Sequence, residues 1–102
     1  MIVELKSVKE FLRIDDDSIE NDIVISSLID EVHRQIEKKC NCIFLPKGSE
    51  MPSDGKRYFI IESNVELAIK IMVRELFDGR GEGSLSNYVE DILFYYKEHS
   101  IG

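Results

Sequence analysis

Residues 22–40 read DIVISSLIDEVHRQIEKKC and hold a long periodic pattern. Apolar residues recur three and four positions apart, at Ile25, Leu28, Ile29, Val32 and Ile36. This spacing places them on one face of a helix and leaves the intervening polar residues on the other face. The stretch therefore predicts a long amphipathic helix, which begins after a cap at Ser18 or Asn21 and ends near Cys40.

Three further helices are predicted around this one. Ser7 and Glu10 have the spacing of a capping box, in which the two side chains satisfy free backbone amides, and predict a helix over roughly 7–13. Ser63 and Glu66 repeat that spacing and predict a helix over roughly 64–77. Asn87 can cap a last helix that runs to about Glu98. Between the last two helices, residues 78–84 contain glycines suited to a left-handed helix end.

Residues 43–62 differ from the helical segments. Ile43–Leu45 and Tyr58–Ile61 are short apolar runs that favour strands, and the ten residues Pro46–Gly55 between them contain both prolines of the chain. We expect either a two-stranded hairpin with a long loop or an extended arm. The fold class is thus mainly α, a small bundle of about four helices with a short β-hairpin or extended arm between the second and third long elements.

The length of 102 residues fits a single domain spanning residues 1–102. The helical stripes predict the residues that supply most of its core. These are Ile25, Leu28, Ile29, Val32, Ile36, Val65, Ala68, Ile69, Met72, Leu76, Val89 and Ile92. The third helix is apolar on other faces as well, so it is either central in the bundle or shared with a partner.

Charge and composition exclude several classes of function. The formal net charge is −7, without a basic stripe, so tight sequence-independent binding to nucleic acid is not expected. The longest apolar run, Ile92–Tyr96, is too short to span a membrane, and the charges in residues 1–11 do not fit a signal peptide. Two cysteines separated by one residue do not form a secreted disulfide framework, so we expect a soluble product of a reducing compartment.

No catalytic, cofactor-binding or metal site is predicted. Cys40, Cys42 and His33 offer three zinc ligands, but a structural site needs four, and His99 is the remaining candidate. The acidic run 15–22 lacks the glycine and the ligand spacing of an EF-hand, so its carboxylates are assigned to the helix N-terminus instead. Gly79, Gly81 and Gly83 follow a helix and lack the lysine of a phosphate loop. A helix-turn-helix is disfavoured because acidic residues would face the phosphates.

The order of these segments resembles a known family. Residues 8–17, VKEFLRIDDD, followed by a helix with an acidic start containing SLIDE and QIE, resemble the opening of the phage head–tail connector family. That family places a VKEYLRID-type segment before a long helix. The irregular arm, the helix containing ELAIKIMV and the closing helix containing YVEDIL also fit the family order. Where the family has a glycine at the end of the second helix, this chain has Cys40-Asn41-Cys42.

The resemblance implies a structural protein of a tailed phage or prophage and not an enzyme. It implies a homo-oligomeric ring matched to the portal, which extends the DNA channel and contacts the portal protein and a tail-completion protein. The implied location is the virion head–tail junction, after synthesis in the bacterial host cytoplasm. The alternative is a small acidic intracellular module that binds or regulates a basic protein. Closed rings would favour the first hypothesis, and tight one-to-one binding to a basic protein would favour the second.

Overall fold

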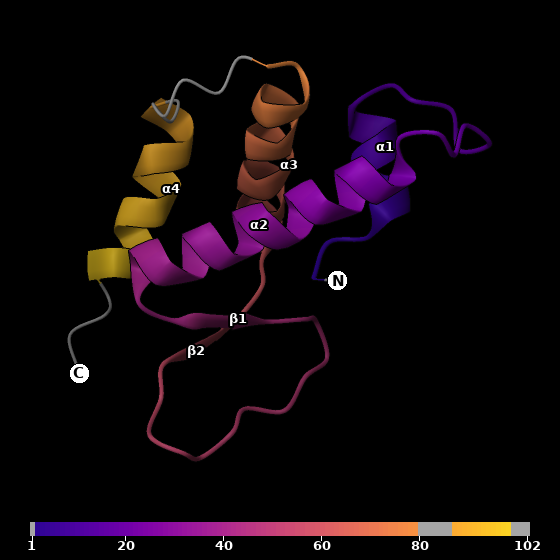
Figure 1. Cartoon of the computed structure of the whole chain (residues 1–102). Coiled ribbons are helices and arrows are strands. Elements are labelled where there is room, and N and C mark those ends of the chain that lie inside the picture. Colours follow the sequence, from indigo (N-terminus) through magenta and orange to yellow (C-terminus); the bar gives the residue numbers. More distant parts are fainter. Residues whose placement is uncertain (1, 80–86, 99–102) are drawn as a thin grey trace.

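The computed structural model describes residues 2–79 and 87–98. The described elements are four helices and two three-residue strands (Figure 1). In chain order they are α1 (Leu5–Phe11), α2 (Asp22–Cys40), β1 (Ile43–Leu45), β2 (Tyr58–Ile60), α3 (Ser63–Phe77) and α4 (Asn87–Glu98). The expected mainly α bundle is confirmed, and the four helices lie close to their expected positions.

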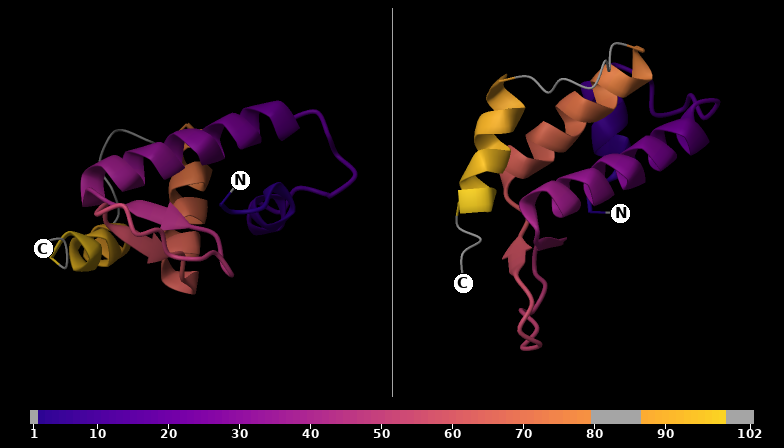
Figure 2. Two further views of the ribbon diagram at one scale, coloured as in Figure 1. Left: turned by 90° about the horizontal axis from the view of Figure 1, so that it is seen from below. Right: turned by 60° about the vertical axis from the view of Figure 1, so that its left-hand side comes forward.

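The helix α2 organises the bundle. Figure 1 shows α3 and α4 standing side by side and α2 running across their lower ends. The helix α1 packs against the N-terminal part of α2. The two strands and the loop that joins them project away from the helices, as the right-hand view of Figure 2 shows. The molecule is therefore a small bundle with one protruding segment, residues 46–57, which we call the arm.

The core lies where the inner faces of α2, α3 and α4 meet. Ten of the twelve expected core residues are buried, and the other two are Leu28 and Leu76. Leu28 is partly buried against the core, whereas the prediction for Leu76 is wrong because its side chain is 38% exposed. Leu76 lies in the last turn of α3, where its neighbour Phe77 packs against the core. Val73, one turn earlier, is fully buried instead.

Aromatic packing joins the strands to the bundle. The ring of Tyr96 on α4 meets Phe44 of β1 and Phe59 of β2 edge-on, with centroid separations of 5.1 and 5.0 Å. The two phenylalanine rings lie 6.0 Å apart. Edge-to-face contacts of this kind stabilise aromatic clusters beyond the area that they bury. Tyr96 is 1% exposed, so α4 and the strand pair share one apolar cluster.

The two strands pair in parallel, with Ile43 opposite Tyr58 and Leu45 opposite Ile60. The hairpin alternative is therefore wrong, because the strands of a hairpin run antiparallel. A parallel pair needs a connection of about a dozen residues to return the chain to the starting edge. The arm, at residues 46–57, supplies that length.

The helix ends differ from the predicted capping boxes. The helix α1 begins at Leu5 with Glu4 as its N-cap, so Ser7 lies inside the helix. The helix α3 begins at Ser63 itself, and the carbonyl of Glu62 accepts the amides of Val65 and Glu66. Both capping-box predictions are wrong, because the preceding extended glutamate provides the N-cap in each case.

Two predicted helix boundaries agree better with the structure. Asn21 is the N-cap of α2, which leaves Ser18 outside, although the Asn21 side chain makes no capping hydrogen bond. At the other end of α2, Asn41 takes the left-handed conformation (φ 51°, ψ 49°), which glycine or asparagine commonly adopts after a helix. Gly79 follows α3 with φ 74°. Gly81 and Gly83 lie outside the described residues. Asn87, the predicted cap of the last helix, is the first residue of α4, so it lies inside the helix.

Candidate functional site

A buried lysine organises the acidic loop before α2. Lys9 on α1 is 3% exposed, and its ammonium donates to the carbonyl oxygens of Asp16 (3.0 Å) and Ser18 (2.7 Å). The same nitrogen lies 2.9 Å from Oδ1 of Asp22 in the first turn of α2. A charge this deeply buried needs such partners, because leaving water unpaired would cost several kcal/mol. We call this arrangement the Lys9 clasp.

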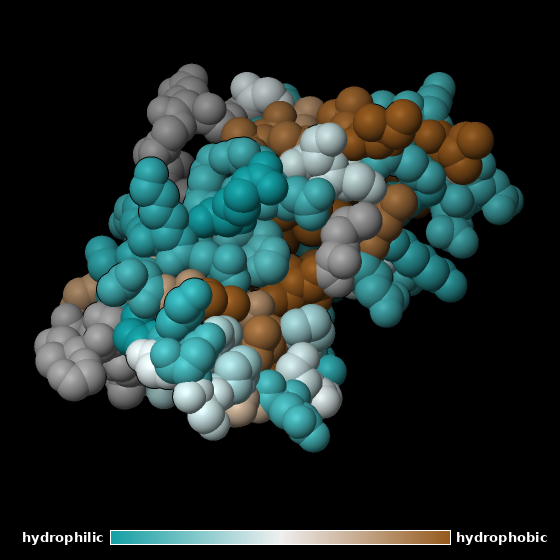
Figure 3. Space-filling model, turned by 60° about the horizontal axis from the view of Figure 1, so that its bottom comes forward, coloured by the Kyte–Doolittle hydropathy of each residue, from teal (hydrophilic) through white to brown (hydrophobic). Residues whose placement is uncertain are grey.

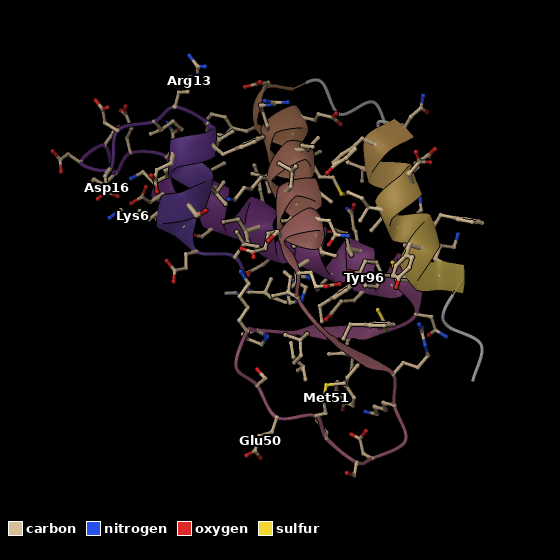
Figure 4. All side chains as sticks on the ribbon, turned by 180° about the vertical axis from the view of Figure 1, so that it is seen from behind. Lys6, Arg13, Asp16, Glu50, Met51 and Tyr96 are labelled. Carbon is tan, nitrogen blue, oxygen red and sulfur yellow. The ribbon has the colours of Figure 1, made fainter. Side chains whose placement is uncertain are left out.

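The acidic run therefore binds a cation that the protein itself supplies. Asp22 lies in the first turn of α2, as expected for carboxylates at a helix N-terminus. Its partner is the Lys9 ammonium, and Lys9 is not among the predicted site residues. The backbone carbonyls that turn inward, at Asp16 and Ser18, bind the same ammonium. The loop is thus cross-linked to α1, and Asp16 itself projects at one extremity of the molecule (Figure 4).

A second cation joins the C-terminal ends of α2 and α4. Arg57 is the last residue of the arm. Its guanidinium donates to the carbonyl of Cys40 (2.8 Å) and to that of Asn41. Its other nitrogen donates to the carbonyl of Tyr96 at 3.1 Å. Terminal helix carbonyls have no partner within their own helix, and a planar fork of donors can satisfy several of them together. We call this arrangement the Arg57 clasp.

The two cysteines lie beside this clasp. The Cys40 thiol donates to the carbonyl of Leu93 (3.7 Å), and both cysteines are buried and reduced. A hydrogen bond from Cys42 lowers the pKa of Cys40, and the same bond raises the pKa of Cys42. The positive charges of Lys97, Arg57 and Lys39 also lower the pKa of Cys40.

The structure does not bring the predicted zinc candidates together. His33 faces Glu37 one turn later on α2, with Nε2 and Oε2 separated by 3.0 Å, and His99 lies outside the described residues. Within residues 2–79 and 87–98, no three side chains of the metal-ligating types gather at one place. Among the helices of this described part, none combines the length and the apolar character needed to cross a membrane.

Exposed apolar residues mark surfaces that the bundle does not cover. On α2 and the turn before it, Ile19, Ile23 and Val24 are 74%, 83% and 51% exposed. On α4, Phe94 is 58% exposed. At the tip of the arm, Met51 is 53% exposed and lies far from the helices (Figure 4). Branched and aromatic side chains at such exposures favour a role in protein–protein contact.

The arm contacts α3 near its start and makes local hydrogen bonds near its end. Near its start, Lys47 pairs with Glu66 of α3 at 2.9 Å. Near its end, Asp54 accepts the Tyr58 hydroxyl (2.7 Å) and the backbone amide of Lys56 (3.1 Å). These two hydrogen bonds lower the pKa of Asp54. Most of the side chains between these points are exposed, so few arm residues contribute to the core.

The geometry thus shows a small bundle closed by two clasps, with uncovered apolar surface on two helices and a protruding arm. The comparisons with known proteins agree with a role in assembly. The model of the family described as phage gp6-like head-tail connector protein matches residues 2–101. No curated protein and no solved structure gives a significant match. Because the family model covers nearly the whole chain, the protein belongs to the phage gp6-like head-tail connector family.

Proposed function

We propose that this connector protein forms a homo-oligomeric ring between the portal and the tail, and that the ring extends the DNA channel. The observation that carries the proposal is the family match over residues 2–101, which establishes a phage structural role. In a ring, identical subunits are arranged around one axis, and each subunit needs exposed surface that contacts its two neighbours. The exposed apolar residues of α2 and α4 provide such surface.

The proposed partners are further copies of the chain, the portal protein and a tail-completion protein. The net charge of −7 supports a channel lining that repels DNA and lets it slide, instead of one that binds it. We therefore expect no tight DNA binding, no membrane partner, no metal or cofactor and no enzymatic activity. The expected location is the head–tail junction of the virion, after synthesis in the cytoplasm of a bacterial host.

The arm is the proposed contact with the portal. The arm carries Glu50 and Met51, and Figure 4 shows both below the helices. The edges of β1 and β2, at the base of the arm, can accept a strand from another subunit. In this proposal residues 47–56 are mobile in the free protein and become ordered on contact with the ring or the portal.

Electron microscopy of the concentrated protein, alone and mixed with portal rings, tests the proposal. The expected result is closed rings, or a layer of density added below the portal. A protein that stays monomeric under both conditions and binds a basic protein one-to-one would contradict the proposal. Binding of free duplex DNA with a submicromolar dissociation constant at physiological salt would contradict the proposed channel lining.

A further inference from the structure

The turn before α2 presents a group of acidic side chains to solvent. Asp15, Asp16, Asp17 and Glu20 are exposed, whereas Asp22 is neutralised by Lys9. Figure 4 shows Asp16 at the extremity of the molecule, with the cationic side chains Lys6 and Arg13 nearer to α1. Four carboxylates and two cations leave this region with a net negative charge. We call it the acidic end.

Apolar side chains lie directly beside these carboxylates. Ile23 is 83% exposed and Ile19 is 74% exposed, so two large aliphatic residues of neighbouring turns are uncovered together with Val24. Figure 3 shows hydrophobic surface next to strongly hydrophilic surface on the right-hand side of the view, where this end lies. An apolar patch with a charged rim has the composition of a protein interface.

The opposite end of α2 carries the reverse charge. Lys38, Lys56 and Arg57 line a cavity of about 470 Å³ where α2 meets the arm, with Ile43 as part of its wall. Lys39 and Lys97 are near enough to Cys40, at the end of α2, to lower its pKa. Five cations lie in this region, and two acidic residues, Glu37 and Asp54, lie near them. The region therefore keeps a net positive charge. We call it the basic end.

The basic end also has an apolar component. Phe94 is 58% exposed and follows Leu93, whose carbonyl accepts the Cys40 thiol at the end of α2. The two ends are separated by the 19 residues of α2, which span about 28 Å. That distance exceeds the screening length of about 8 Å at physiological salt, so the two charges do not neutralise each other within one subunit.

We propose that the acidic end of one subunit docks against the basic end of the next copy of the chain, with Ile23 and its apolar neighbours packed against the surface around the cavity. The inference rests on the proposed ring and names the two faces that build it. A contact between two different faces of identical subunits is heterologous, and it closes into a ring when the rotation between subunits permits. A single self-complementary face would instead stop at a dimer.

Two charge-reversed variants test this docking. The acidic-end variant carries Asp16→Lys, Asp17→Lys and Glu20→Lys, and the basic-end variant carries Lys38→Glu, Lys39→Glu and Lys56→Glu. All six side chains are exposed, so circular dichroism should show unchanged folding. Each variant alone should lose self-association, with the dissociation constant raised about a hundredfold by like charges in the contact. Mixed together, the variants should associate again, because every contact then joins opposite charges.

A matched control carries the same change in charge elsewhere. Asp30→Lys, Glu90→Lys and Asp91→Lys are exposed substitutions in the middle of α2 and on α4, and they should leave self-association intact. Ile23→Ser provides an uncharged test, since it should weaken the contact without altering either charge group. Sedimentation velocity measures association in every case, and electron microscopy shows whether the complexes are rings.

The outcomes separate this inference from the proposed function. Wild-type rings that persist in either variant, or variants that fail to associate when mixed, would overturn the docking and leave the ring intact. Loss of rings in the matched control would overturn it as well. A basic-end variant that still forms rings but loses affinity for duplex DNA would assign that end to DNA instead. If the wild type forms no rings even on the portal, the proposed function fails, while association of the mixed variants would still support the contact.

Discussion

The two clasps at opposite ends of α2 perform similar tasks in different surroundings. Lys9 is 3% exposed and has a carboxylate among its partners, whereas Arg57 is partly buried and donates to three carbonyls of two helices. A buried ammonium depends on the protein for its solvation, but water can take over some bonds of a partly buried guanidinium. The Lys9 clasp should therefore contribute more to the free energy of unfolding than the Arg57 clasp.

The largest effect is expected for Lys9→Met. Removal of the ammonium leaves the Asp22 carboxylate and two carbonyls without their partner, which should lower the free energy of unfolding by about 3–5 kcal/mol. Chemical denaturation measures this loss. Lys6→Met on the exposed side of the same helix is the control and should change stability by less than about 0.5 kcal/mol. Equal effects of the two substitutions would show that the Lys9 clasp contributes little.

A smaller effect is expected for Arg57→Met. The loss of three hydrogen bonds at a partly hydrated site should cost about 1–2 kcal/mol, while the neighbouring exposed Lys56→Met should be almost neutral. Arg57→Lys should recover only part of the loss, because one ammonium lacks the planar fork that reaches both helices. A cost for Arg57→Met as large as that for Lys9→Met would remove the difference between the two clasps.

A third substitution tests the hydroxyl of Tyr96, the residue whose backbone carbonyl accepts a hydrogen bond from Arg57. Tyr96→Phe keeps the ring between Phe44 and Phe59 but removes the hydroxyl that donates to Glu62 at 2.9 Å, which should cost about 1 kcal/mol. Tyr88→Phe, on an exposed side chain of the same helix, is the control.

The same substitution predicts a change in pH dependence. Burial and the Glu62 carboxylate raise the pKa of Tyr96 above its ordinary value near 10. The folded state therefore holds this proton more tightly than the unfolded state, so the contribution is complete below pH 10 and is lost as the pH rises further. Tyr96→Phe should lack this alkaline loss in denaturation curves measured at rising pH. An identical alkaline profile in both proteins would contradict the assignment.

The fold was predictable where one helical face carries the information. The stripe from Ile25 to Ile36 specifies α2 without any long-range contact, and most of its residues are buried as expected. The strand direction was not predictable, because Ile43–Leu45 and Tyr58–Ile60 pair in parallel only through the arm and the shared contact with Tyr96. Sequence periodicity does not report such non-local pairing.

The clasps were missed for a related reason. Lys9 and Arg57 look like ordinary surface cations, because their partners are mostly backbone carbonyls, and every residue has one. One signal was present for Lys9: it lies between the apolar residues Val8 and Leu12, shortly before a loop with four carboxylates and Asp22 at the start of α2. A cation on the inner side of a short helix that faces an acidic loop favours a buried ion pair. The exposed apolar residue Ile23 falls outside the stripe of α2, so the helical period does predict its exposure, whereas Ile19 precedes the helix.

The smallest effect on stability is expected in the arm, which lies outside both clasps. Replacement of Lys47–Lys56 by Gly and Ser removes the Lys47–Glu66 pair and the Asp54 contacts, all of them at exposed or half-buried side chains worth little to folding. A two-residue hairpin turn would fail here, because parallel strands require the linker to run back along β1 before β2 begins. About eight Gly and Ser residues reach far enough, and Pro46 and Arg57 stay in place.

This arm variant should unfold within a few degrees of the wild-type temperature and yet fail to assemble with the portal. If the arm becomes ordered on assembly, as proposed, fixing ten residues costs on the order of 10 kcal/mol, so the portal contact must be extensive enough to offset that loss. Thermal denaturation and electron microscopy of portal complexes measure the two properties on one preparation. A variant that unfolds far below the wild type would place the arm within the fold. One that still joins the portal would show that the contact with the portal lies on the helices.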